Sequence, residues 1–289
     1  MAANLKEVRN RIKSVANTQQ ITKAMKMVSA AKLRRAQERI VQMRPYANKL
    51  REIASNIVSG GDVSIELAKE RDVKNVLLVV VTSDRGLCGG FNSNIIKLAK
   101  RTVTEKYSSA SVTILPVGKK AMEAFRRLNY KMVNDFWQLF SSLNFEEASK
   151  ASHYIMEKYS DGTYDRVEII YSQFKNAATQ IFANENFLPV EKAKSEGGKS
   201  SKKDFIFEPD KDELVAYLIP KILNTQFFKV LLDSNASEHG ARMTAMDKAS
   251  DNANEIMKEL KITYNRARQA AITTELNEIV SGANALAEA

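Results

Sequence analysis

The chain has 289 residues, 44% of them hydrophobic, which is enough apolar material for one large or two ordinary domains with a real core. No run of eighteen apolar residues is present, which argues against a membrane-spanning helix. The single cysteine cannot form an internal disulfide, and one cysteine with two histidines makes a zinc site improbable. The net charge of +10 is concentrated in residues 1–57, where thirteen Lys or Arg stand against three acids. Such a basic segment suits nucleic acid, an anionic membrane or an acidic protein surface, or is a solvated helix face.

The N-terminal segment is predicted to be one long helix. Residues 3–58 contain no glycine and a single proline, Pro45, which we expect to kink the helix or to start a new turn. From Leu33 onward, steps of three and four residues select a heptad pattern of Ala36, Ile40, Met43, Ala47, Leu50, Ala54 and Ile57. This repeat predicts a coiled-coil seam.

The heptad pattern changes in the first half of this helix. Three residues that are not apolar fall on the expected seam positions: Gln19, Thr22 and Lys26. A displaced apolar stripe lies beside them, formed by Ile21, Met25 and Val28. We therefore expect a stutter in the seam at this point.

The middle of the chain predicts a mainly parallel sheet with helices on its faces. Residues 75–82, NVLLVVVT, indicate a strand buried on both sides, and the glycine-rich turn SDRGLCGGFN at 83–92 leads from it into a helix. Further strands are predicted at 111–117, 131–137, 165–174 and 179–190, with helices at 119–128 and 146–159, and a short edge segment at 205–209. The strands at 165–174 and 179–190 are expected to form an antiparallel edge hairpin.

The C-terminal segment is predicted to be a second long helix. The chain turns helical at residue 210, Pro220 is expected to interrupt that helix, and the long helix follows from residue 222. Steps of three and four residues select His239, Met243, Met246, Ser250, Ala253, Met257, Leu260, Tyr264, Ala267, Ala271 and Thr274. We expect this helix to pair with the N-terminal one in an antiparallel coiled coil that projects from a globular body, which divides the chain into residues 1–60, 61–209 and 210–289.

No group of residues predicts an active site or a cofactor site. The glycines of the turn, Gly86, Gly89 and Gly90, match neither the dinucleotide-binding nor the P-loop spacing, so a tight turn is the favoured interpretation over a phosphate site. Cys88 is expected to be buried and inert rather than an activated thiol. His239 lies on the predicted seam and is expected to be packed and hydrogen-bonded. The sequence thus favours a protein that is not an enzyme by itself.

Four segments, in order along the whole chain, resemble the gamma subunits of the F-type ATP synthases. They are IKSVANTQQITKAMKMVSAAKLRRAQ, SDRGLCGGFN, SEHGARMTAMDKASDNA and YNRARQAAITTELNEIVSGA. The resemblance implies an α/β fold in which a Rossmann-like domain is inserted between the N- and C-terminal helices of a long antiparallel coiled coil. It also implies a non-catalytic central-stalk rotor subunit, which transmits torque between the ion-driven membrane ring and the catalytic ring and so couples ion translocation to ATP synthesis or hydrolysis.

The same resemblance implies partners and contact residues. The partners are the alpha and beta subunits around the shaft, the epsilon subunit and the membrane ring of c subunits, with no nucleic acid and no cofactor. The implied contact residues are Met25 and Lys26 in the shaft, Arg268 and Gln269 at the beta subunits, and Phe207 and Glu208 near the c ring. Residues 279–289 would be the tip that turns in the collar of the catalytic ring.

The basic N-terminus lacks the apolar stretch of a secretory signal and shows no transit segment. Together with the resemblance, this favours a bacterial chain on the cytoplasmic face of the plasma membrane, with a processed mitochondrial form as the alternative. Because Cys88 is the only cysteine, the redox switch of plastid members, which needs a cysteine pair, is not expected. Two other functions stay open on the residues alone. A basic coiled coil that binds nucleic acid or ribosomes predicts affinity that falls steeply with salt. A small-molecule enzyme on the α/β domain predicts a ligand at the glycine turn.

Overall fold

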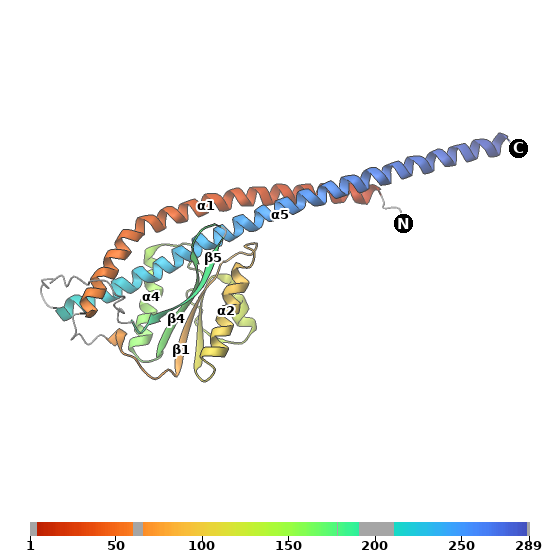
Figure 1. The fold of residues 1–289 in the computed structure, drawn as a ribbon. Helices are drawn as coiled ribbons and strands as arrows, with labels where there is room; N and C mark the ends of the chain where they lie inside the picture. The colour runs from red at the N-terminus through yellow and green to blue at the C-terminus, as the bar shows by residue number, and fades with distance from the viewer. Residues whose placement is uncertain (1–4, 60–65, 178, 191–210, 288–289) are drawn as a thin grey trace. The chain divides into compact units, whose positions relative to one another are not determined.

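The computed structural model describes residues 5–59, 66–177, 179–190 and 211–287, and Figure 1 shows its elements. Two compact units divide the chain. The first joins residues Met1–Val28 to Met243–Ala289, and the second is Ser29–Arg242. The predicted boundaries at residues 60 and 209 and the predicted edge segment at 205–209 lie outside the described residues.

The second unit contains a five-stranded sheet with the strand order β3-β2-β1-β4-β5. The strands are β1 (Asn75–Val81), β2 (Ser111–Val117), β3 (Lys131–Met132), β4 (Arg166–Phe174) and β5 (Gln180–Leu188). In this order, each of the strands β3, β2, β1 and β4 is parallel to its neighbour, and β5 is antiparallel to β4. The predicted parallel sheet with an antiparallel edge hairpin is therefore confirmed.

Strand β1 lies at the centre of the sheet and is buried on both faces. Its side chains after Asn75 are all buried. Leu77 and Val79 belong to one hydrophobic cluster, whereas Leu78 and Val80 belong to the other. Because successive side chains of a strand point to opposite faces, an unbroken apolar run is what a strand covered on both sides requires.

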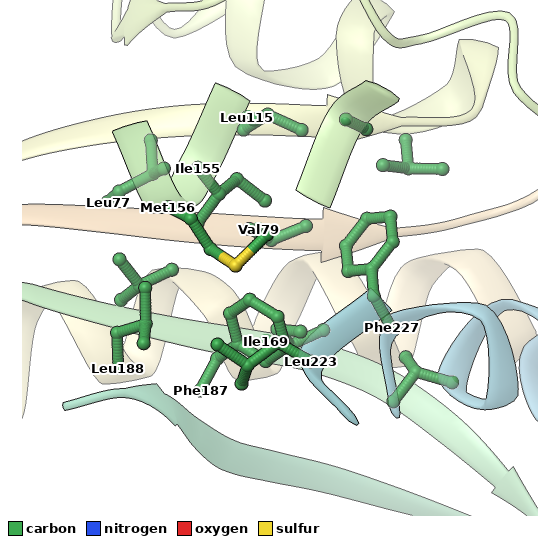
Figure 2. Close-up of a cluster of buried hydrophobic side chains, with 14 of the residues drawn as sticks. Leu77, Val79, Leu115, Ile155, Met156, Ile169, Phe187, Leu188, Leu223 and Phe227 are labelled. Atoms are coloured by element: carbon green, nitrogen blue, oxygen red, sulfur yellow. The ribbon is translucent and has the colours of Figure 1, made fainter. Parts of the chain in front are cut away.

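Helices cover the two faces of this sheet. On one face α2 (Phe91–Lys106) and α3 (Lys119–Arg127) supply buried side chains such as Ile95 and Phe125. On the other face α4 (Phe145–Ser160) joins the first part of α5 (Lys211–Ala287), as Figure 2 shows for Ile155, Met156, Leu223 and Phe227 around Val79 and Ile169. The short helix η1 (Glu66–Ala68) adds Leu67 to the same cluster. The α/β fold with helices on both faces is thus confirmed.

The two long helices contain the two prolines without a break. Helix α1 (Leu5–Ser59) runs through Pro45, and the orange part of its ribbon curves in Figure 1. Helix α5 runs through Pro220, so the predicted interruption at this residue is wrong. A proline removes one backbone hydrogen bond, and here the flanking residues Ile219 and Leu223 are buried in the core, which holds the helix on both sides of it.

The fold requires a glycine at position 118, because no side chain fits there. Its φ is +100°, and a Cβ atom there would lie 2.2 Å from the carbonyl oxygen of Thr82. We expect Gly118→Ala to lower the free energy of unfolding by about 3 kcal/mol or more, because the strain of a positive φ and the steric clash with the Thr82 backbone both destabilise the folded state. Gly86→Ala is the control, since a Cβ there meets nothing within 4 Å. Urea denaturation of both variants measures the difference, and equal stabilities would contradict the prediction.

Candidate functional site

The first unit is a two-helix coiled coil. On α5, the side chains beyond residue 250 that are at least partly shielded from solvent are Ala253, Met257, Leu260, Tyr264, Ala267 and Ala271. These are the predicted seam positions, and of that series only Thr274 is exposed. Contacts of α1 with α5 pair Thr22 with Ser250 and Arg9 with Tyr264, so the residue numbers rise on one helix as they fall on the other. The antiparallel coiled coil is confirmed in this unit.

The predicted stutter in α1 is wrong. Gln19, Thr22 and Lys26 are shielded from solvent at the regular heptad positions, in line with Leu5, Val8, Ile12 and Val15 before them. Ile21 and Val28, two members of the predicted displaced stripe, are instead 59% and 56% exposed, and the third, Met25, is partly shielded. Polar side chains can occupy these seam positions because α5 places polar partners, Ser250 and Asp247, opposite Thr22 and Lys26.

Two polar layers replace apolar packing near the end of this seam that lies at Val28 and Met243. The hydroxyl groups of Thr22 and Ser250 are 2.7 Å apart and buried, and Lys26 Nζ lies 2.5 Å from Asp247 Oδ1 at a partly exposed position. Thr22 can also donate to the carbonyl of Gln19, and Ser250 to that of Met246. Since each hydroxyl has one proton, one of them donates across the seam while the other donates to its own helix.

A third contact lies nearer the start of α1. The Arg9 guanidinium donates to the Tyr264 hydroxyl at 2.9 Å, and its Cζ atom lies 5.8 Å from the centre of the ring. The hydrogen bond from Arg9 lowers the pKa of Tyr264. Arg9 is exposed and Tyr264 is only partly shielded, so this solvent-accessible contact adds little to the stability of the pairing.

The predicted contact residues lie in separate places. Met25 is partly shielded, and the ammonium group of Lys26 is used within the chain by Asp247. Arg268 and Gln269 are exposed on α5, about 30 Å along the helix from the level of Asp247. The structure therefore does not bring the two pairs together. Phe207 and Glu208 lie outside the described residues.

The end of α5, part of which is predicted only to be the tip of the shaft, has an exposed apolar stripe. Its members recur at helical spacing and are between 49% and 82% exposed: Ile272, Leu276, Ile279 and Leu286. The described part of α1 starts at Leu5, and every described α5 side chain beyond Ala271 is exposed. A row of large apolar side chains on a helix surface indicates a contact with another molecule.

The glycine turn of the second unit binds the side chain of Arg242. Nη2 of Arg242 donates to the carbonyl oxygens of Arg85 at 3.1 Å and Gly86 at 3.3 Å, while Nη1 donates to Glu238 at 2.5 Å. Leu87 and Gly89 have positive φ, which closes the turn. The tight-turn interpretation is confirmed, and these carbonyl groups serve a cation, whereas a phosphate is bound by N–H groups.

Cys88 and His239 are both buried, as predicted. Cys88 is 2% exposed and packs with the apolar side chains of α2 and β1, while Asn92 Nδ2 lies 3.2 Å from its Sγ. His239 Nδ1 lies 3.4 Å from Arg242 Nη1. Burial, with the positive charges of Arg242 and Lys32, lowers the pKa of His239 to about 4. Among the described residues, no group of three or more His, Cys, Asp or Glu side chains could hold a metal ion.

The buried carboxylate of Glu168 is a feature that the sequence did not predict. It accepts hydrogen bonds from Tyr107 at 2.5 Å and Asn184 at 2.7 Å and is paired with Lys106. Burial by itself would raise the pKa of Glu168, but these bonds outweigh it and lower the pKa. The one feature of the sequence that could have indicated this buried carboxylate is a single acidic residue within the apolar run of β4. Because the group is fully bonded within the domain, it has a structural role.

The buried His239 makes stability depend on pH. Its folded-state pKa of about 4 lies below the unfolded value, so the unfolded chain binds the extra proton as pH falls from 6.5 toward 4. We expect this to cost up to about 3 kcal/mol, which the raised pKa of buried Glu238 offsets in part. His239→Gln should flatten the fall in stability, whereas His153→Gln, which changes the exposed histidine, should not. Urea denaturation between pH 7 and 4.5 tests this, and identical profiles for the two variants would contradict it.

Comparison with known proteins shows the family. A family model described as "ATP synthase" matches residues 4–286. The ATP synthase gamma chain of Cytophaga hutchinsonii is 55% identical over 291 aligned positions, which cover 98% of this chain and 99% of the relative. A chain from the mitochondrial ATP synthase central stalk and c ring of Tetrahymena thermophila is 28% identical, with a TM-score of 0.60, 80% of this chain covered and 99% of that one.

A second solved structure shares the fold over more of the chain. It is a chain of the mitochondrial ATP synthase of Euglena gracilis, 23% identical with a TM-score of 0.67. The match covers 98% of this chain and 94% of that one. The long terminal helices and the sheet between them are therefore a shared architecture.

Proposed function

The chain belongs to the family of ATP synthase gamma chains, and we propose that it is the central rotor shaft of an F-type ATP synthase. In this role it transmits torque between an ion-driven c ring and a catalytic ring of alpha and beta subunits. One observation supports this most directly: α1 and α5 each run from one unit into the other as a single helix, through Pro45 and Pro220. Backbone hydrogen bonds hold every turn of such a helix, so a torque applied at one end is transmitted to the other end.

We propose that the chain has no catalytic centre of its own. A shaft acts on catalytic sites elsewhere by making different contacts with each surrounding subunit as it turns. A contact that is stronger in one conformation of a subunit shifts the population toward that conformation. An asymmetric pair of helices meets this requirement because its surface differs at every angle.

The exposed surface of the first unit supports two kinds of contact with the ring. Arg268 and Gln269 are solvent-exposed polar side chains that can reach loops of the beta subunits. The apolar stripe from Ile272 to Leu286 suits the collar in which the tip of the shaft turns. Met25 extends this surface on α1, while Lys26 contacts the ring only in competition with Asp247. Phe207 and Glu208 are the residues proposed to contact the c ring, next to the epsilon subunit.

The basic charge of α1 fits an acidic ring surface. Lys13, Lys23, Arg35 and Arg39 are all exposed, so their charges face outward rather than into a seam. The same charges motivated the alternative of a nucleic-acid- or ribosome-binding protein. The comparisons support the ATP synthase and give no support to that alternative.

The site of action follows from the complex. ATP synthase gamma chains are peripheral parts of a membrane complex, and no described helix of this chain is long and apolar enough to cross a bilayer. We propose the cytoplasmic face of a bacterial plasma membrane, where the c ring would hold the chain.

Reconstitution tests the rotor function. The full chain is mixed with purified alpha and beta subunits, and assembly and ATP hydrolysis are measured with and without it. We expect hydrolysis to depend on the chain and to fall by about tenfold when α5 is truncated after Asn265, since that removes the exposed stripe and about 1.4 kcal/mol of contact energy in the transition state. Undiminished hydrolysis without the chain, or no assembly with folded partners, would refute the assignment.

A single exposed cation tests the proposed contact with the beta subunits. We expect Arg268→Ala to lower hydrolysis by the reconstituted complex several-fold, because a charge-assisted hydrogen bond is lost. Arg266→Ala is the matched control, since it removes the same exposed charge from another side of α5. Equal effects of the two substitutions would show a general charge effect and no specific contact at Arg268.

A further inference from the structure

The packed side of α1 opens beside the end of strand β4. Of the heptad positions of α1 in the second unit, Ile40 and Leu50 are buried, whereas Met43 and Ala47 between them are only partly shielded from solvent. Ala47 has the smallest side chain of these four, and Pro45 removes a backbone hydrogen bond in the same part of the helix. The helix therefore leaves a space between itself and the elements that it packs against.

This space is a cavity of about 170 Å³ within the second unit. Met43 and Ala47 line it from α1, Phe174 lines it from the end of β4, and Leu232 lines it from α5. An apolar cavity of about 150 Å³ is large enough to bind benzene. The cavity beside α1 thus has room for a small apolar group, such as one aromatic ring or a short branched chain.

A positively charged side chain without a partner lies at this cavity. Lys229 on α5 is one of the lining residues and is partly shielded from solvent. Among the residues that the structure describes, none forms an ion pair with its ammonium group or accepts a hydrogen bond from it. Because a charged group in such a place has lost part of its hydration, an anion that reaches it gains a charge-assisted hydrogen bond.

Two polar side chains beside Lys229 restrict the kind of anion. Asp233 lies one turn further along α5, is buried and already has another interaction. Its negative charge repels a ligand that carries two charges. Gln173, at the end of β4, has an amide group that can donate a hydrogen bond to a ligand oxygen. The lining therefore fits a single carboxylate on an apolar body better than a phosphate or a dicarboxylate.

We propose that this cavity is a binding site for a small apolar monocarboxylate, such as benzoate or a short branched-chain acid. The carboxylate contacts Lys229 and Gln173, and the apolar body lies between Met43, Ala47 and Phe174. A ligand in this position touches α1, β4 and α5 together, so binding stabilises their packing. The site goes beyond the proposed rotor function and does not depend on it, since none of these residues is a proposed partner contact.

Titration with sodium benzoate tests the site in the isolated full chain. The methionines carry isotope-labelled methyl groups, and the variant Met43→Leu identifies the NMR signal of Met43. We expect benzoate to shift this signal saturably and to leave the signal of Met257, in the coiled coil, unchanged. Sodium chloride at equal concentration controls for ionic strength. The absence of a saturable shift at Met43, or an equal shift at Met257, would overturn the proposal.

Two comparisons test the chemistry of the site. Benzyl alcohol has the same ring without the charge, so it should bind about tenfold more weakly than benzoate. Lys229→Met should weaken the binding of benzoate by about the same factor and leave that of benzyl alcohol unchanged. Lys221→Met, which removes an exposed charge from α5, is the matched control and should alter neither. Equal affinities for the two ligands, or equal effects of the two substitutions, would contradict a carboxylate site.

Urea denaturation gives a second measurement that does not rely on Lys229→Met. Benzoate should raise the unfolding midpoint of the unchanged chain, because it binds the folded state. Ala47→Leu fills part of the cavity and should abolish this effect, with helix content by circular dichroism unchanged. A benzoate effect that survives Ala47→Leu would place the ligand elsewhere and overturn the proposal. None of these readouts involves ATP hydrolysis, so the site and the rotor function can fail independently.

Discussion

The structure depends on the backbone continuity of α5. One helix of 77 residues supplies Leu223 and Phe227 to the core of the α/β unit and, farther along, the seam residues Ser250 and Tyr264 of the coiled coil. Within each unit, the spacing of 3.6 residues per turn decides which side chains of α5 face its partner, which is the sheet in one unit and α1 in the other.

Two different kinds of packing meet this constraint. In the α/β unit, α5 buries large apolar side chains against a sheet that is covered on both faces. In the coiled coil, the same helix buries mostly Ala, Ser, Met and Tyr against α1. The second kind of contact gives less apolar burial per turn. A shaft benefits from this division, because its base must be rigid while its surface must not adhere strongly to any one neighbour.

The glycine turn shows how a local motif acquires its role from a distant residue. The turn has the composition of a phosphate-binding loop, but its spacing and its carbonyl groups suit a cation, which Arg242 supplies from α5. Arg242 also pairs with Glu238 on its own helix, so the turn, the helix and the buried His239 form one hydrogen-bonded unit. In this protein the turn is an attachment point for the long helix.

The sequence alone determined the strands, the long helices, the parallel sheet with its edge hairpin and the α5 seam as far as Ala271, because these follow from local periodicity and from the placement of glycine and proline. The resemblance of four segments also indicated the family. Only the tertiary structure decided the course of α5 through Pro220, the buried carboxylate of Glu168 and the orientation of α1. In the last case, hydrophobic patterning indicated a displaced stripe at Ile21 and Val28, whereas the structure places Thr22 and Lys26 in the seam, where Ser250 and Asp247, more than two hundred residues away, contact them. A pattern within one helix cannot include the polar groups that a distant helix brings opposite it.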